Sequence, residues 1–104
     1  MTVNVASLLD KAKTVHRLSS DYKLALVMGV SHRSLASYRD GKTLPDSRVI
    51  SILCSLTGDD PALIAAEVEE MRSTSDEARE LWRSVAFLVS QARKAGVGGV
   101  NYRN

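Results

Sequence analysis

Residues 21–41 read DYKLALVMGVSHRSLASYRDG, and their spacing predicts two short helices joined by a tight bend. Gly29 permits the positive φ that a three- or four-residue turn needs. Ala25 is small enough to let the two helices cross closely, and Ser31 is a good N-cap for the second helix. The residues expected to face inward from that second helix are Leu35 and Tyr38. This stretch therefore predicts a close-packed helical pair within an all-α fold.

The opposite side of the second helix is small, polar and basic. Arg33 and Ser37 lie four residues apart, so both are expected on the exposed face, with His32 beside them. A short helix that buries an apolar edge and exposes such a face fits the major groove of DNA. The pattern therefore indicates a helix that can enter the groove.

Helical spacing recurs along the rest of the chain and predicts six helices with no strands. The helices outside the first pair are expected over residues 5–14, 46–57, 62–71 and 76–95. The residues expected to open them are Asn4, Asp46, Asp60 and, in a capping box with Glu77, Thr74. We expect one domain over residues 1–72, followed by a long helix and a tail over residues 73–104.

The charge of the chain is small but unevenly distributed. The net charge over 104 residues is +2. Residues 1–45 hold seven Lys or Arg and three acidic residues. Residues 46–104 hold seven Lys or Arg and nine acidic residues. A basic first half hints at a polyanionic partner for that half, although a solvated surface is the simpler interpretation of charge alone.

Several other classes of protein are disfavoured. Cys54 is the single cysteine, so no disulfide forms within the chain, and this residue is expected in the core. No apolar run is long enough for a bilayer and no leader pattern is present, so we expect a cytoplasmic protein without a membrane partner. No catalytic pair, phosphate-binding glycine loop or metal cluster is recognisable, so we expect neither enzymatic activity nor a cofactor. His16 is expected in a loop or at a helix end and not as a metal ligand. Glu67, Glu69 and Glu70 are expected to form a solvated acidic face.

The chain resembles the lambda-repressor-like helix-turn-helix family, of the Cro/repressor or XRE type. The resemblance is carried by Leu24-Ala25, Gly29-Val30-Ser31, Leu35, Tyr38, Asp40-Gly41-Lys42 and Pro45. It covers about residues 5–70 and implies a five-helix DNA-binding domain. A looser similarity links the whole chain to small regulators of filamentous phages. Together they imply a phage or prophage repressor that binds a palindromic operator in double-stranded DNA as a homodimer.

The resemblance also implies roles for single residues. The positions that reach base edges match His32, Arg33 and Ser37. The positions that contact phosphate match Ser31, Lys42 and Thr43. Asp21 stands where the family often has a phosphate-contacting Gln, so Ser20 or Lys23 is expected to take over that contact. Because Ser37 is short, readout through DNA shape is also expected.

The last helix carries a broad apolar stripe. Its members are Leu81, Trp82, Val85, Leu88, Val89 and Ala92, widened by Ala86 and Phe87. One interpretation is that this helix covers the first five helices. The other, which we favour, is a dimer interface formed by Leu81, Trp82, Val85, Leu88 and Val89, because large apolar side chains are costly to expose and aromatic ones are enriched in interface cores.

A second function stays open, because a fold does not determine a function. The chain can instead be a helix-turn-helix protein-interaction module that binds a host or phage protein through its last helix and no longer binds DNA. Salt-dependent binding of duplex DNA distinguishes the two hypotheses.

Overall fold

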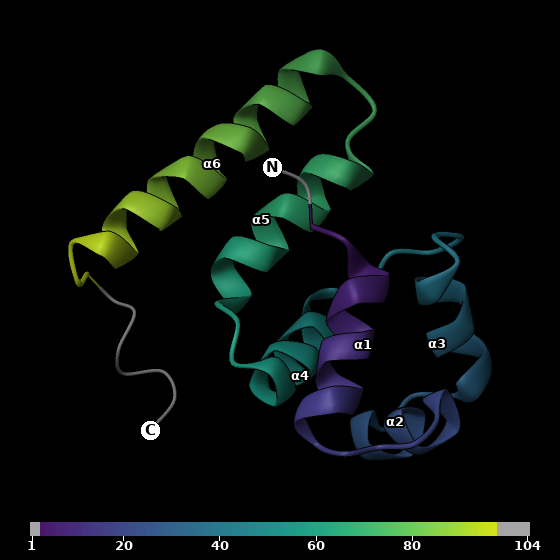
Figure 1. Ribbon diagram of the computed structural model, residues 1–104. Coiled ribbons are helices and arrows are strands. Elements are labelled where there is room, and N and C mark those ends of the chain that lie inside the picture. Colours follow the sequence, from purple (N-terminus) through teal and green to yellow (C-terminus); the bar gives the residue numbers. More distant parts are fainter. Residues whose placement is uncertain (1–2, 98–104) are drawn as a thin grey trace. The chain divides into compact units, whose positions relative to one another are not determined.

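The computed structural model describes residues 3–97, and every regular element in that range is an α-helix (Figure 1). The elements are α1 (Val5–Val15), α2 (Asp21–Met28), α3 (His32–Arg39), α4 (Ser47–Thr57), α5 (Pro61–Arg72) and α6 (Asp76–Lys94). The all-α prediction is confirmed, and the helix ends lie close to the expected ones. The expected tail at Gly98 and Gly99 lies outside the described residues.

The helices fall into two compact units. Val3–Asp59 holds α1 to α4, and we call it the N-terminal unit; the residues from Asp60 onward hold α5 and α6 and form the C-terminal unit. This division differs from the expected boundary after residue 72. The reason is that α5 packs with α6, so its contacts group it with the last helix.

Side-chain caps explain where the helices begin. An oxygen of each capping side chain accepts a hydrogen bond from a first-turn N–H, and the caps are Asn4, Ser20, Ser31, Asp46, Asp60 and Ser75. The predicted capping box of Thr74 with Glu77 is wrong. The helix begins at Asp76, so Ser75 takes the extended cap position and its Oγ accepts from the N–H of Ala78 at 3.1 Å.

The core of the N-terminal unit combines small and apolar side chains from all four of its helices. They include Leu9 and Ala12 of α1, Leu24 and Ala25 of α2, Leu35 of α3, and Leu53 and Cys54 of α4. Burial of Cys54 confirms the expectation for that residue. His16 lies at the end of α1, as predicted, and its Nε2 is 2.8 Å from the carbonyl oxygen of Leu56 in α4.

In the C-terminal unit, α6 packs on α5 with one side and exposes the other. The half-buried apolar residues include Trp82, Val85 and Val89. The exposed ones are Leu81, Phe87 and Leu88. The stripe read from the sequence is therefore divided between two sides of the helix, and only the second of these sets is open to a further partner.

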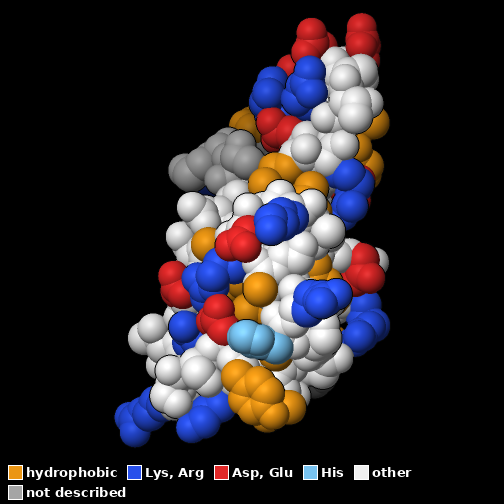
Figure 2. All heavy atoms as spheres, turned by 90° about the vertical axis from the view of Figure 1, so that its right-hand side faces the viewer, with side chains coloured by type: hydrophobic (Ala, Val, Ile, Leu, Met, Phe, Trp, Pro, Cys, Tyr) orange, Lys and Arg blue, Asp and Glu red, His pale blue; other side chains and the backbone are white. Residues whose placement is uncertain are grey.

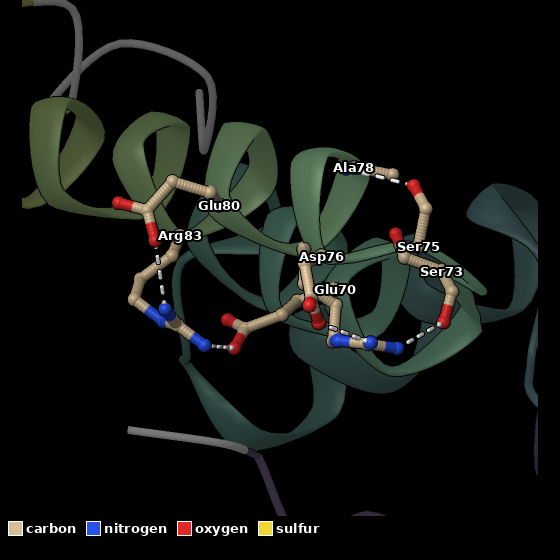
Figure 3. A network of polar contacts seen from close by, with 8 residues as sticks. Glu70, Ser73, Ser75, Asp76, Ala78, Glu80 and Arg83 are labelled. Atoms are coloured by element: carbon tan, nitrogen blue, oxygen red, sulfur yellow. Dashed lines mark hydrogen bonds and ion pairs between the residues drawn. The ribbon is translucent and has the colours of Figure 1, made fainter.

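An arginine of α6 joins the two helices of this unit (Figure 3). The Arg83 guanidinium donates to Glu70 of α5 at 3.1 Å and to Glu80 of α6 at 2.9 Å. The expectation that Glu70 lies on a solvated face is wrong, because packing beside Arg83 leaves its side chain only 12% exposed. Glu67 is half-buried as well, and burial raises the pKa of its carboxyl.

Candidate nucleic-acid interface

The connection between α2 and α3 has the conformation that the sequence predicts. Gly29 adopts the left-handed conformation with a φ of 71°. The N–H of Val30 then donates to the carbonyl of Ala25 at 3.1 Å and closes the end of α2. Ala25 and Leu35 are both buried, so the small side chain and the inward leucine lie where close packing requires them. This bend determines how α3 leaves α2.

The first turn of α3 exposes two of the three predicted base-contacting residues. Arg33 is exposed, and its side chain forms no hydrogen bond or ion pair with any residue between 3 and 97. His32 is exposed beside it, and its ring meets the Tyr22 ring of α2 edge-on at a centroid distance of 6.1 Å. Such aromatic contacts favour one ring orientation. A free guanidinium and an oriented imidazole therefore stand side by side.

Ser37, the third predicted base-contacting residue, is held by the loop that follows α3. It is half-buried rather than fully exposed. Its Oγ accepts a hydrogen bond from Thr43 Oγ1 at 2.9 Å, and its carbonyl accepts from the N–H of Lys42 at 3.0 Å. The structure thus brings one predicted base position against two predicted phosphate positions, and it braces the loop on α3.

The predicted phosphate-contacting residues divide into open cations and engaged hydroxyls. Lys23 and Lys42 are exposed, and neither forms an ion pair within the described part of the chain. Ser20 Oγ accepts from the N–H of Lys23 at 3.1 Å, and Ser31 Oγ accepts from the N–H of Ser34 at 3.0 Å. The two serines therefore act first as helix caps, while the lysines are open to an anion.

A charge network that sequence reasoning missed ties α3 to α1 and α2. Nε and Nη2 of Arg39 donate to the two carboxylate oxygens of Asp21, each at 2.8 Å. The same guanidinium is 2.9 Å from Asp10 of α1, and Lys13 is 3.1 Å from Asp21. The hydrogen bonds from Arg39 hold the pKa of Asp21 below its usual value, against the opposing effect of partial burial. Asp21 is thus committed to positioning α3.

No local sequence signal reveals this pair. Arg39 and Asp21 are 18 residues apart, which is far beyond the spacing at which side chains meet on one helix. Their adjacency depends on the bend at Gly29 and on the packing of α3. The charge count over residues 1–45 includes Arg39 among the cations that could contact a polyanion. In the structure Arg39 instead forms ion pairs with the carboxylates of Asp10 and Asp21.

The outward side of α2 is more apolar than a phosphate-contacting helix requires. Tyr22, Leu26 and Val27 are exposed, with Lys23 among them. Figure 2 shows Lys and Arg side chains scattered among acidic ones on the face it presents, with apolar side chains gathered beside a histidine. Since α2 is apolar around most of its circumference, its sequence did not indicate which apolar residues stay outside.

Comparisons with known proteins give no further constraint: no family model, curated protein or solved structure matches the chain. Among residues 3–97, no helix is both long and apolar enough to cross a membrane. In the same range, no group of three or more His, Cys, Asp or Glu side chains is placed to hold a metal ion.

Proposed function

We propose that this chain is a sequence-specific transcriptional regulator of the phage-repressor type, which binds a palindromic operator in double-stranded DNA as a dimer. In this proposal the N-terminal unit, with α1 to α4, carries the DNA-binding surface, and α3 is the recognition helix that enters the major groove. The observation that carries the proposal is the open Arg33 guanidinium beside His32 on the first turn of α3.

The charge arrangement supports the same proposal. Lys13 and Arg39 are neutralised by carboxylates, whereas Lys23, Arg33 and Lys42 are exposed without an ion pair inside the described chain. These three cations come from α2, α3 and the loop after α3. Contacts from such elements to phosphates set the register of a protein on DNA, and base-edge contacts supply the specificity.

Base readout in this proposal falls mainly on Arg33. The planar guanidinium can donate to O6 and N7 of one guanine, which is the commonest specific contact in the major groove. His32 supplies a second, adjacent donor or acceptor. Ser37, held by Thr43, contributes less by direct contact, so the rest of the selectivity comes from the sequence-dependent shape of the operator.

One observation favours a protein-interaction module, although it lies on α2 and not on the last helix, through which the sequence predicted that such a module would bind. Tyr22, Leu26 and Val27 form an exposed apolar strip on α2, and exposed apolar patches often mark protein-binding surfaces. A partner protein that covers this strip would also cover His32, which touches Tyr22. The two functions would then compete for the same side of the N-terminal unit.

Selection of duplexes from a random pool, followed by fluorescence anisotropy at several salt concentrations, tests the proposal. We expect an enriched inverted repeat whose affinity falls steeply with salt, since each phosphate contact releases a counterion. The control is a shuffled duplex of the same length, which measures non-specific binding. No enrichment, together with no binding to either duplex at low salt, would leave the protein-interaction module as the better account.

A further inference from the structure

The outward side of α6 exposes apolar residues that its own unit does not use. Leu81, Phe87 and Leu88 are 57%, 62% and 64% exposed, although the helix already packs on α5 with its other side. Apolar side chains gathered on one side of a long helix cost free energy when they stay in water. This surface, which we call the outer face of α6, therefore calls for a partner.

The spacing of the outer face is that of a helix-pairing seam. Leu81 and Leu88 are seven residues apart, and so are Glu80, Phe87 and Lys94. Seven residues make two helical turns, so each set lies along one line and the two lines run side by side. Ser84 lies between them, and its small side chain leaves a shallow hollow lined by Glu80, Arg83, Ser84, Phe87 and Leu88. The seam thus offers both protruding side chains and a place to receive them.

The charges along α6 are complementary to those of a second α6 helix that runs antiparallel to it. The helix starts with Asp76 and Glu77 and ends with Arg93 and Lys94. Arg93 is already bonded to Asp60 at 2.6 Å, so the cation at this end with no ion pair within residues 3–97 is Lys94. Two parallel copies would place like charges together, whereas two antiparallel copies bring each acidic end beside a basic end and oppose the helix dipoles favourably.

Two residues of opposite charge are equally spaced about Phe87 on α6. Glu80 and Lys94 each lie seven residues from Phe87, one on each side. A two-fold axis near Phe87 places the two Phe87 rings together and sets Glu80 of each copy level with Lys94 of the other. The same axis sets Leu88 of each copy level with Ala86 of the other, about 3 Å along the helix from the hollow beside Ser84. One arrangement thus pairs opposite charges and brings the Phe87 rings together.

We propose that a second copy of this chain occupies the outer face, with the two α6 helices packed antiparallel through Leu81, Phe87 and Leu88 and flanked by Glu80–Lys94 pairs. The inference rests on the proposed function only in that it supplies the two-fold dimer that a palindromic operator requires. One helix face is small beside the about 800 Å² per partner of a standard interface, so the dimer dissociates at micromolar concentrations.

Sedimentation velocity of the full chain without DNA, across the micromolar range, tests the dimer. Leu88→Glu places a charge in the seam and is expected to raise the dissociation constant at least about tenfold. The matched control is Leu26→Glu on α2, because Leu26 is equally exposed at 64% and lies outside α6. The control should leave the dissociation constant unchanged, and circular dichroism should show the helical content of the wild type in both variants.

A wild-type chain that stays monomeric throughout, or a control as disruptive as Leu88→Glu, would overturn the proposal and assign the outer face to another occupant.

The orientation of the two helices is tested by reversing charges. Glu80→Lys and Lys94→Glu should each weaken the dimer, and the double variant should recover most of the loss, because residue 80 of one copy then meets residue 94 of the other with opposite charges again. In a parallel pair each position meets itself, so absence of recovery would overturn the antiparallel arrangement. Because both experiments are done without DNA, a wild-type chain that failed to bind DNA would change neither the dimerisation result nor the orientation result.

Discussion

At the scale of single residues, the proposed interface depends on which cations remain open. Arg33 and Arg39 lie on the same short helix and carry the same charge, yet their surroundings differ. Arg39 is bound to Asp10 and Asp21, whereas Arg33 meets no acid in the described chain. An open guanidinium can satisfy its donors on a base or a phosphate, and a bound one cannot do so without breaking its ion pairs. The proposed function therefore assigns base readout to Arg33.

Arg33→Ala should cost about 1–3 kcal/mol per half-site and relax the preference at one base position, if Arg33 binds one guanine with both donors. Arg33→Lys should recover part of the affinity with less selectivity, because lysine lacks the planar fork. Affinities for a panel of operators with single substitutions measure both effects.

The matched control for Arg33→Ala is Lys42→Ala, which also removes one exposed and unpaired cation. Lys42→Ala should weaken every duplex alike and reduce the salt slope by about one per half-site. Equal losses on operator and on shuffled DNA for Arg33→Ala would show that Arg33 contacts only phosphate.

At the scale of helices, α3 is held by contacts at both of its ends. The bend at Gly29 and the Ser31 cap set its beginning, and Arg39 ties its end to α1 and α2. Both Arg39 and Asp21 are about three-quarters covered, so removing one of them takes the bidentate partner from a partly buried charge, which keeps only Lys13 or Asp10. The network therefore contributes both stability and the orientation of α3.

Arg39→Met should lower the free energy of unfolding by about 1–3 kcal/mol, a value reduced from that of a fully buried pair because solvent reaches the site. Urea unfolding measures it, and Arg72→Met is the control, since Arg72 and Glu69 form an exposed pair within α5. Operator affinity should fall as well, because the end of α3 loses its anchor. A change no larger than that of Arg72→Met would contradict the assigned role.

The same network predicts a pH dependence of stability. The folded protein holds the pKa of Asp21 below its usual 3.8, so the ionised carboxylate stabilises the fold above that pH. This contribution is lost as the pH falls from 3.8 through the lowered pKa. Urea unfolding between neutral pH and the acid range should show a loss that Asp21→Asn removes. An unchanged acid dependence in Asp21→Asn would exclude this residue as its source.

The start of α6 gives a further test at the scale of an element. Ser75→Ala removes the side chain that accepts from the N–H of Ala78, and it should cost about 1 kcal/mol of stability. Thr74→Ala is the natural control, because Thr74 lies just before the cap and should have little effect. Urea unfolding of both variants shows whether Ser75 or Thr74 caps α6. A larger loss of stability for Thr74→Ala than for Ser75→Ala would support the capping box of Thr74 with Glu77.

At the scale of the whole molecule, the proposed function divides its tasks between the two units. The N-terminal unit carries Lys23, Arg33 and Lys42 and the candidate recognition helix, while the C-terminal unit carries the outer face of α6. In a dimer, two half-sites on one DNA molecule bind together, and the second binding event becomes intramolecular. Operator affinity should therefore depend on residues that touch no DNA.

Leu88→Glu should accordingly lower the affinity for a full inverted repeat by at least about tenfold and leave the affinity for an isolated half-site unchanged. Anisotropy titrations of the two duplexes at one salt concentration measure the difference. The variant keeps every residue of the N-terminal unit, so an equal loss on both duplexes would indicate damage to the DNA-binding surface and not to the dimer.

The sequence by itself was sufficient wherever a structural choice depends on neighbouring residues. The bend at Gly29, the cap at Ser31 and the close approach at Ala25 were all predicted, because each is determined by the steric or hydrogen-bonding properties of one residue type. The six helices and their approximate ends follow for the same reason. The cap of α6 was misplaced because Thr74 and Ser75 have nearly equal capping ability.

Only the tertiary structure decided what depends on residues distant in the chain. It paired Asp21 with Arg39 and set Ser37 against Thr43, and neither contact has a local pattern. It grouped α5 with α6 and left Trp82 half-buried, while Leu88 stayed exposed. The physical reason is that an apolar stripe in the sequence shows how much of a helix surface needs to be buried. Which neighbouring element buries each part of that surface depends on packing in three dimensions.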